Sequence, residues 1–337
     1  MRIADVLEVL VERSLTREEA GSVFARLVRG DWSEIEMAAL LGALKVRGET
    51  PEEIAGAAQA LRDAACPFPR PDYPFADTCG TGGSGLQTLN VSTAVAVVAA
   101  EIGIPVAKHG NRAVSSKSGS ADVLEALGLR LDTSPRQARA CLDEVGLCFL
   151  FAPRYHAGVR HAMPVRRAFA TRTIFNLLGP LANPACPPVQ LVGVYDPALC
   201  LPLASTLAML GAQVALVVHG DGLDEIAVHD ATRAALYRDG RVTELELTPE
   251  EAGLERRPAE ALQGGDPETN ARALRRLLEG RENGAYADAV ALNAGALAWI
   301  AGTAAGFADG VSLARDALRS GRPARRLERW IEICRDA

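Results

Sequence analysis

The chain has 337 residues, of which 48% are hydrophobic and 23% charged, and its formal net charge is −6 at pH 7 with an isoelectric point near 5.5. This length and composition can bury the core of one large domain or of two smaller ones. The acidic balance argues against a nucleic-acid-binding protein that works through a positive field over its whole surface.

Basic residues nevertheless gather in two segments that contain no Asp or Glu. The first, 145–195, contains five arginines. The second, 102–121, contains Lys108, Arg112 and Lys117. An acidic protein that confines its bases in this way suits a small polyanionic ligand, whereas chance clustering on a solvated face is the alternative.

The cysteines and two uncharged stretches bear on the compartment and the membrane. Seven cysteines form no C-x-x-C pair, which argues against a zinc site or a disulfide framework and is typical of reduced thiols. The first residues lack the apolar run of a signal peptide, so we expect a cytoplasmic protein.

The stretches 197–219 and 289–308 approach the length of a membrane span. Because Pro202 and Gly211 interrupt the first and Asn293 lies in the second, we expect buried helices, a strand completing the first stretch, and no membrane partner.

The first 65 residues carry repeated signals for helix starts. Thr16, Ser33 and Thr50 each place a hydroxyl three residues before a Glu, which is the capping-box pattern of a helix N-terminus. Gly30 and Gly48 stand where helix C-termini are expected. The segment therefore predicts a small module of four short helices.

A different pattern follows the segment 66–75, whose four prolines in ten residues indicate a domain border. Beyond it, buried strands alternate with helices, and Asp239-Gly240 marks the turn of a hairpin. The predicted buried strands are 104–107, 148–151, 189–194 and 214–218. The alternation predicts a mainly parallel sheet covered by helices, and the chain from Asn270 onward is predicted to be helical.

The segment D-T-C-G-T-G-G-S-G at 77–85 places four glycines within six residues. Glycines let backbone N–H groups converge on an anion without obstruction by side chains. Asn90, Ser92 and Thr93 follow at the start of an apolar helix, where unpaired N–H groups favour phosphate. By itself, the segment fits a phosphate site or a structural turn equally well.

Segment 105–122 begins at the next predicted strand and continues as a polar loop. Lys108 and Arg112 supply positive charge there. Its neutral hydrogen-bonding side chains are Asn111, Ser115, Ser116 and Ser120. Because ligands collect at the carboxyl ends of strands in open α/β sheets, we expect this loop to face the same ligand.

Segment 217–225, V-V-H-G-D-G-L-D-E, again passes from a strand to a loop and ends in two carboxylates, Asp224 and Glu225. Paired carboxylates on a surface loop are usually only solvated charge. Beside two loops of the phosphate-binding type, their hard oxygen atoms favour a Mg²⁺ site.

In this order and spacing, the G-T-G-G loop, the K-H-G-N-R loop and the D-E pair resemble those of the anthranilate phosphoribosyltransferase family. F-N-L-L-G-P-L-A-N-P at 175–184, G-G-D at 264–266 and L-N-A-G at 292–295 extend the resemblance over nearly the whole chain. The family is similar in fold to class II pyrimidine nucleoside phosphorylases. The resemblance implies an α/β protein in which a small all-helical domain is hinged to a larger α/β domain with a mainly parallel central sheet.

The implied helical domain is 1–66, completed by about 164–187, and the implied α/β domain is 75–163 with 188–337. The implied activity is Mg²⁺-dependent transfer of the phosphoribosyl group of 5-phosphoribosyl pyrophosphate (PRPP) to the anthranilate amine. The products would be N-(5-phosphoribosyl)anthranilate and pyrophosphate, in tryptophan biosynthesis. The family also implies a homodimer formed through the helical domain, with no nucleic-acid partner.

Carried over residue by residue, the resemblance implies three groups of site residues. The PRPP group is Gly80, Gly83, Ser84, Thr88, Asn90, Val91, Ser92, Thr93, Lys108, Asn111, Arg112, Ser115, Ser116 and Ser120. The anthranilate group is Gly80, His109, Asn111 and Arg166. The metal group is Ser92, Asp224 and Glu225. Arg166 would grip the anthranilate carboxylate, and no strong general base is implied, although His109 would lie near the ring or the amine and could assist.

The chain departs from the family pattern at Ser84, where the family usually has Asp. Loss of that carboxylate removes either a repulsive charge beside the pyrophosphate or a ligand for a metal. Val159 is a lesser departure, at a position where some relatives carry Tyr.

Two other functions compete with the implied transferase. A nucleoside phosphorylase of the same fold would cleave a ribosyl bond with phosphate, but the F-N-L-L-G-P-L segment and the D-E pair count against it. A non-catalytic, nucleic-acid-binding relative is the second alternative, which the change at Ser84 permits. The acidic isoelectric point and the intact K-H-G-N-R loop count against that alternative.

Overall fold

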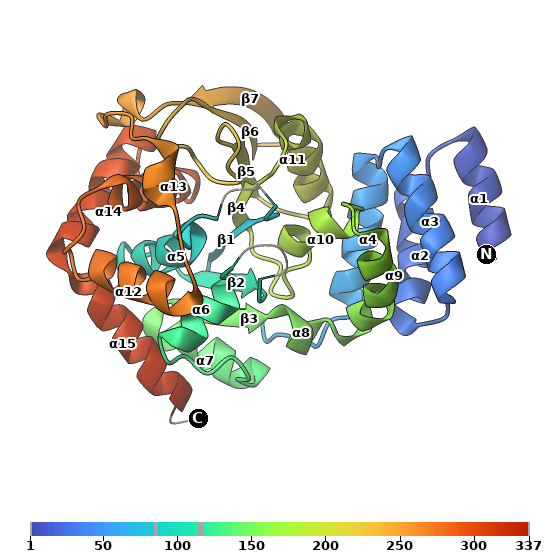
Figure 1. Ribbon diagram of the computed structural model, residues 1–337, viewed down its shortest axis with the longest axis horizontal. Coiled ribbons are helices and arrows are strands. Elements are labelled where there is room, and N and C mark those ends of the chain that lie inside the picture. The colour runs from blue at the N-terminus through green and yellow to red at the C-terminus, as the bar shows by residue number, and fades with distance from the viewer. Residues whose placement is uncertain (1, 84–86, 114–116, 336–337) are drawn as a thin grey trace.

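The computed structural model describes residues 2–83, 87–113 and 117–335. Within these residues, four N-terminal helices stand beside a seven-stranded sheet whose faces are covered by further helices (Figure 1). The strands are β1 (Ala76–Gly80), β2 (Val106–Gly110), β3 (Leu147–Phe151), β4 (Val189–Gly193), β5 (Val214–His219), β6 (Thr232–Arg238) and β7 (Arg241–Leu247). The α-helices are α1 (Ile3–Glu12), α2 (Arg17–Arg29), α3 (Glu34–Arg47), α4 (Pro51–Asp63), α5 (Val91–Glu101), α6 (Ser120–Ala126), α7 (Pro135–Val145), α8 (Ala152–Tyr155), α9 (Met163–Phe169), α10 (Phe175–Leu181), α11 (Cys200–Met209), α12 (Pro267–Leu278), α13 (Ala285–Ile300), α14 (Phe307–Ser320) and α15 (Arg322–Arg335). Short 3₁₀ helices are η1 (Ala157–Ala162), η2 (Pro197–Leu199), η3 (Glu250–Ala252) and η4 (Ala259–Leu262).

The predicted N-terminal helices are confirmed. Thr16, Ser33 and Thr50 each accept a hydrogen bond from the backbone N–H three residues on and complete a capping box with the Glu there. Gly30 ends α2 in the left-handed conformation, and Gly48 ends α3 with a positive φ of 86°. Local capping therefore sets the bounds of α2, α3 and α4.

The core of the helical part extends beyond its first four helices. Buried side chains of α1–α4 pack with those of α9 and α10, and the rings of Phe24 and Phe175 lie 6.1 Å apart. Figure 1 shows α9 lying against this bundle and α10 between the bundle and the sheet. We propose that 1–66 with 164–187 form one domain, and 75–163 with 188–337 the other.

The sheet has the order β3-β2-β1-β4-β5-β6-β7, with the first five strands parallel and β6 and β7 antiparallel. Side chains of β4 and β5 alternate between two cores: Leu191 and Leu216 face one, whereas Val192 and Val217 face the other. Strands buried on both faces carry apolar residues at successive positions, as predicted. The α/β class, the four predicted strands and the Asp239-Gly240 turn are confirmed.

Two features of the sheet differ from the prediction. A further strand, β1, lies in the middle of the sheet and begins the glycine-rich segment, which was predicted as a phosphate site or a turn and not as a strand. The first predicted strand, 104–107, is found as β2 and continues to Gly110, because its parallel pairing with β3 extends to Gly110 and Phe151. Lys108 and His109 are therefore buried strand residues and not loop residues.

Different helices cover the two faces of the sheet. On one face, α5 packs on β1 and β2 and α13 packs on β4 and β5, while α11 covers β5 and β6 from the other side. The uncharged stretch 197–219 forms η2, α11 and β5, and 289–308 falls mainly in the buried helix α13. No helix among the described residues is both long and apolar enough to cross a membrane.

Candidate active site

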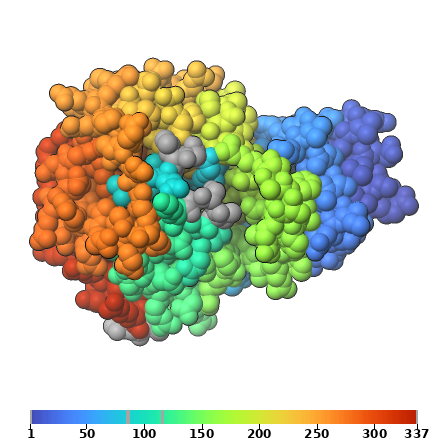
Figure 2. Space-filling view, in the orientation of Figure 1, coloured from blue at the N-terminus to red at the C-terminus, as the bar shows by residue number. Residues whose placement is uncertain are grey.

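The carboxyl ends of the parallel strands bring the three predicted segments to one edge of the sheet. The strands β1, β2 and β5 end at Gly80, Gly110 and His219. The order of strands reverses at the β1–β4 pair, which is where ligands bind in open α/β sheets. Figure 2 shows a hollow in the surface here, between the α/β part and the green segment that contains α8–α10.

The loop after β5 folds back over the end of β1. Asp224 Oδ2 accepts a hydrogen bond of 2.8 Å from the backbone N–H of Gly82. A Cβ atom at Gly80 would lie 2.2 Å from Asp224 Oδ2, and one at Gly193 would lie 1.6 Å from the carbonyl oxygen of Asp224. Only glycine therefore permits the close approach that joins the D-E pair to the glycine-rich segment.

Lys108 lies beside this junction, on β2. Its Nζ donates to the carbonyl oxygen of Thr78 at 2.6 Å and to Ser92 Oγ at 3.1 Å. The carboxylate of Glu225 accepts a hydrogen bond from the backbone N–H of Ser92. One buried ammonium thus ties the end of β1 to the start of α5, next to the carboxylates.

The arrangement of Ser92, Asp224 and Glu225 can hold a divalent cation. Burial, followed by the negative charge of Asp224, raises the pKa of Glu225 above its usual range. A cation would relieve the repulsion between the two carboxylates, and hydroxyl and carboxylate oxygens are ligands that Mg²⁺ takes. The described residues contain no group of three or more His, Cys, Asp or Glu side chains placed to hold a metal by themselves. Such a cation would therefore also need oxygen ligands from water or a bound phosphate.

Asn90, at the N-terminus of α5, connects this helix to the loop after β2 and to α12. Its side chain bonds to Ser118 in the loop after β2 at 3.3 Å and accepts a hydrogen bond of 2.9 Å from Asn270 on α12. The G-G-D segment lies alongside, because Gly264 N donates to Gln87 O at 2.6 Å. The chain around Thr88 is paired in the same place, through a bridge to residue 263.

The loop after β2 holds three predicted PRPP residues with different surroundings. Ser120 Oγ donates to the carbonyl oxygen of Asn111 at 3.3 Å. The guanidinium of Arg112 pairs with Asp122 at 3.1 Å and with Glu125 at 2.7 Å. Arg112 is thus already neutralised, whereas the exposed Asn111 side chain lies at the surface of the loop.

His109 points away from this loop, toward α10. Its Nδ1 lies 3.0 Å from the carbonyl oxygen of Gly179, and its ring is 5.2 Å from the ring of His156 in an edge-on arrangement. Because a carbonyl oxygen only accepts, Nδ1 carries the proton, and Nε2 is a buried acceptor without a partner among the described residues. Burial, followed by the nearby His156, lowers the pKa of His109 to about 3. The imidazole is therefore neutral at physiological pH.

Arg166 lies on α9, the helix whose Val165 packs in the core of the N-terminal helices. Its Nη1 contacts Met163 Sδ at 3.8 Å, and its guanidinium lies over the ring of Phe175 at 5.1 Å. Burial lowers its pKa, and no carboxylate of the described chain raises it in compensation. A half-buried guanidinium in this state is available to an incoming carboxylate.

The remaining predicted residues are placed as follows. Gly83 accepts a hydrogen bond from Arg172, whose guanidinium also stacks on the ring of Tyr195 at 3.8 Å. Val91 and Thr93 are buried in the first turn of α5, where the hydroxyl of Thr93 has no partner in the described chain. Ser84, Ser115 and Ser116 lie outside the described residues.

Four residues that hold the site together were not predicted. Arg172 supports the glycine-rich segment, and Asn293 on α13 bonds to the backbone at Ile226, next to Glu225. Asn183 and Asp77 bond to each other at 2.8 Å below His109. Asn183 and Asn293 lie in the motifs 175–184 and 292–295, and these motifs were the sequence signal that could have identified them. Nothing in the motifs indicated which backbone groups the two side chains would contact.

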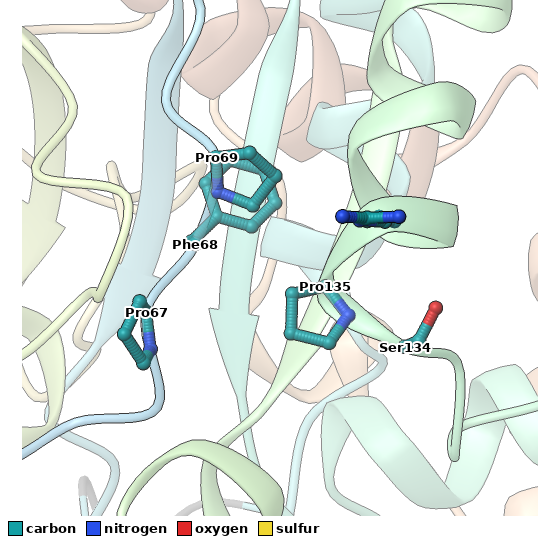
Figure 3. A pocket seen from close by; sticks show the side chains of 6 residues that line it. Pro67, Phe68, Pro69, Ser134 and Pro135 are labelled. Atoms are coloured by element: carbon teal, nitrogen blue, oxygen red, sulfur yellow. The ribbon is translucent and has the colours of Figure 1, made fainter.

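A pocket of about 480 Å³ opens on another part of the surface. It is lined by Pro67, Phe68, Pro69, Ser134, Pro135 and Arg136 (Figure 3). None of these residues belongs to the candidate site, and the lining is dominated by proline rings.

The chain is similar to known proteins over nearly its whole length. Residues 5–65 match the helical bundle domain of a glycosyl transferase family, and residues 72–324 match the α/β domain of such a family. The anthranilate phosphoribosyltransferase of Sorangium cellulosum is 61% identical over 96% of this chain and 92% of its own. That of Aeromonas hydrophila is 56% identical over 93% of this chain and 91% of its own.

Solved structures agree. The crystal structure of anthranilate phosphoribosyltransferase from Thermus thermophilus has 46% identity and a TM-score of 0.94, over 99% of this chain and 100% of its own. The enzyme from Saccharomyces cerevisiae in complex with PRPP and Mg has 27% identity and a TM-score of 0.87, over 96% of this chain and 94% of its own. The chain belongs to the anthranilate phosphoribosyltransferase family.

Proposed function

We propose that this chain transfers the phosphoribosyl group of PRPP to the amine of anthranilate, releasing pyrophosphate, as a cytoplasmic enzyme of tryptophan biosynthesis. The observation that carries this proposal is the 2.8 Å hydrogen bond between Asp224 Oδ2 and the N–H of Gly82. It joins a carboxylate loop suited to a cation to a glycine-rich loop suited to phosphates. Relatives that are 61% and 56% identical and carry this activity by name support it.

The PRPP site would be built around the start of α5. Backbone N–H groups near Gly80 and Gly83, the side chain of Asn90 and the first turn of α5 would receive the phosphates. Lys108 would support this site indirectly, because its ammonium group bonds to Ser92 and to Thr78 on β1 and holds both in place. The other predicted members are Ser84, Thr88, Val91, Thr93, Asn111, Arg112, Ser115, Ser116 and Ser120.

The cation would be Mg²⁺, held by Ser92, Asp224 and Glu225 together with the substrate pyrophosphate. The oxygen-only donor set and the adjacent carboxylates fit such an ion. The yeast relative in complex with PRPP and Mg supports the proposal. When bound, the ion would stabilise the negative charge that develops on the departing pyrophosphate.

Anthranilate would enter from the side of the helical domain. Arg166 and Asn111 would take its carboxylate, and Gly80 would lie near the reacting end of the molecule. His109 would lie beside the amine, with Nε2 as a hydrogen-bond acceptor because Nδ1–H is engaged by Gly179. An acceptor there would orient the amine lone pair toward the ribose.

The chemical step would be a displacement at the anomeric carbon through a cationic transition state. The amine is already a nucleophile, so positioning would dominate catalysis and no strong general base is needed. The neutral His109, with a pKa of about 3, is a poor acceptor of a full proton at physiological pH. Approach of the two domains would exclude the water that could otherwise hydrolyse PRPP.

We also propose that the chain is a homodimer formed through its helical domain. Val11 on α1, with 80% of its surface exposed, and Ile35 and Val46 on α3, with 82% and 90%, are the most exposed large apolar side chains of the described chain. Replacing Val46 and Ile35 by Glu should convert the dimer to a monomer in light-scattering measurements. A wild-type chain that is already monomeric at micromolar concentration would contradict the proposal.

The reaction is tested by following anthranilate fluorescence with PRPP and Mg²⁺ and adding EDTA midway. A fall in fluorescence that EDTA stops supports the substrate pair and the metal requirement together. A flat signal at high enzyme concentration would reject the anthranilate assignment. Phosphorolysis of nucleosides and salt-sensitive binding of single-stranded DNA would then be the next assays.

A further inference from the structure

We infer that Asn183 is a positioning residue for anthranilate, because it fastens the segment after α10 to β1 and to β2, the strand that carries His109. The inference rests on the proposed function, since it assigns a role within that site. Asn183 is the second asparagine of the F-N-L-L-G-P-L-A-N-P motif, to which the proposed chemistry gives no task.

Every polar atom of the Asn183 side chain is engaged, and the residue has no exposed surface. Its Nδ2 donates to Asp77 Oδ2 at 2.8 Å and to the carbonyl oxygen of Ala107 at 2.8 Å. Its Oδ1 accepts from the backbone N–H of Ala185 at 2.9 Å. Both amide hydrogens face acceptors, so the amide has one permitted orientation. One side chain thereby joins three segments: β1, β2 and the connection from α10 to β4.

The same network reaches His109 from two directions. Asp77, which is also buried, accepts the backbone N–H of His109 at Oδ1, at 3.3 Å. The ring of His109 donates through Nδ1 to Gly179, four residues before Asn183. The segment from Gly179 to Asn183 is thus tied to β2 at both ends, and His109 is enclosed within that closed loop.

This closed loop decides where the free Nε2 of His109 points. If the Asn183 amide is removed, Asp77 and the carbonyl oxygen of Ala107 lose their shared donor inside the protein, which is costly in a buried site. The segment that carries Gly179 is then free to shift, and the His109 ring loses the acceptor that fixes its tautomer. The phosphate-binding half of the site, at the start of α5, makes no contact with Asn183 among the hydrogen bonds of the described residues.

The test compares Asn183→Ala with Asn176→Ala. Asn176 lies in the same motif and its Oδ1 accepts the backbone N–H of Thr173 at 3.0 Å, away from β1 and β2. We expect Asn183→Ala to raise the KM for anthranilate by about tenfold, because the His109 ring would no longer be held in one orientation, while the KM for PRPP stays within about twofold. Asn176→Ala should leave the ratio of the two KM values unchanged, even where it lowers the melting temperature.

A second readout follows the imidazole itself. In protein labelled with ¹⁵N-histidine, the His109 nitrogens should report the Nδ1–H tautomer in wild type and in Asn176→Ala. They should report a mixture of tautomers in Asn183→Ala. Asp77→Asn approaches the same network from the other side and should give the same split in KM, so it serves if Asn183→Ala does not fold.

The outcomes separate the inference from the function on which it rests. If wild type does not consume anthranilate, both the function and the inference are overturned. If wild type is active but Asn183→Ala and Asp77→Asn change both KM values in parallel, or neither, Asn183 is a structural residue only and the inference fails. Failure of both variants to fold, with a normal KM ratio in the milder Asn183→Ser, would overturn the inference in the same way.

Discussion

Asn293, in the middle of α13, hydrogen-bonds to both backbone polar groups of Ile226. Ile226 N donates to Asn293 Oδ1 at 3.0 Å, and Asn293 Nδ2 donates to Ile226 O at 3.2 Å and to Ala289 O at 2.9 Å. The residue is fully buried, and Ile226 directly follows the carboxylates Asp224 and Glu225. The Asn293 side chain on helix α13 thus fixes the backbone of the loop that would hold the cation, because it bonds to the N–H and the C=O of one residue, as a neighbouring β-strand does.

Replacing Asn293 by Ala should therefore impair the cation site. Both backbone groups of Ile226 would lose their partner, so the loop would no longer be held in one position. We expect the Mg²⁺ concentration for half-maximal activity to rise by about tenfold or more, with the KM for anthranilate nearly unchanged. Titration of activity with Mg²⁺ and of PRPP binding by calorimetry would check this; an unchanged Mg²⁺ requirement would show that the loop does not depend on Asn293.

Removing a carboxylate of the D-E pair should damage turnover more than removing the imidazole of His109. Asp224→Asn and Glu225→Gln keep the shape of the side chains but take away charge that the cation needs, and we expect kcat to fall by about 10²–10³-fold. His109→Gln removes only an orienting acceptor, so we expect a fall of about tenfold or less. Steady-state kinetics on the three variants decides between these roles, and the reverse order would defeat the assignment.

Local signals in the sequence predicted much of this fold. Capping boxes could be predicted at Thr16, Ser33 and Thr50 because they depend on neighbours within a few residues. The apolar runs of β3, β4 and β5 could be predicted because these strands are buried on both faces. The strand β1 was missed because Ala76–Gly80 contains Asp and Gly, which are depleted in strands. Its position at the centre of the sheet comes from pairing with β2 and β4, which no local pattern reveals.

The site was predictable to the level of segments but not of contacts. The resemblance named the three loops, and the structure joins them through a hydrogen bond between Gly82 and Asp224, 142 residues apart, and one between Lys108 and Ser92, 16 residues apart. The resemblance did not place Lys108 inside the sheet, where a buried charged side chain is unfavourable unless it finds hydrogen-bond acceptors such as the carbonyl oxygen of Thr78. Whether such acceptors lie within reach of Lys108 depends on the folded arrangement.

A methyl group at Gly193 should unsettle the carboxylate loop. A Cβ atom there would lie 1.6 Å from the carbonyl oxygen of Asp224, so the loop would have to move. We expect Gly193→Ala to lower stability by about 1–3 kcal/mol and to raise the Mg²⁺ requirement. Gly42→Ala is the matched control, because its Cβ would only touch Phe169 at 3.8 Å inside α3. Urea unfolding and Mg²⁺ titration of both variants check this; equal behaviour would mean that the loop tolerates the methyl group.

The stability contributed by His109 should depend on pH in a defined direction. Burial lowers its pKa from 6.5 to about 3, so between these values the unfolded chain binds a proton that the folded protein does not. Stability from this group is therefore present above pH 6.5 and is lost as the pH falls toward 3, by up to about 1.4 kcal/mol per pH unit. Burial raises the pKa of Asp77 from 3.8 to about 6, which gives the opposite slope between those values and partly offsets the effect in wild type.

The comparison of wild type with His109→Gln isolates the histidine, because Asp77 is present in both proteins. As the pH falls from 6 to 5, the stability of wild type relative to the variant should decrease by about 1 kcal/mol, measured by urea unfolding at each pH. Above pH 7.5 the difference should be constant. A difference that stays constant down to pH 5 would mean that His109 titrates in the folded protein near its ordinary value, and that its imidazole is open to solvent and not held neutral between β2 and α10.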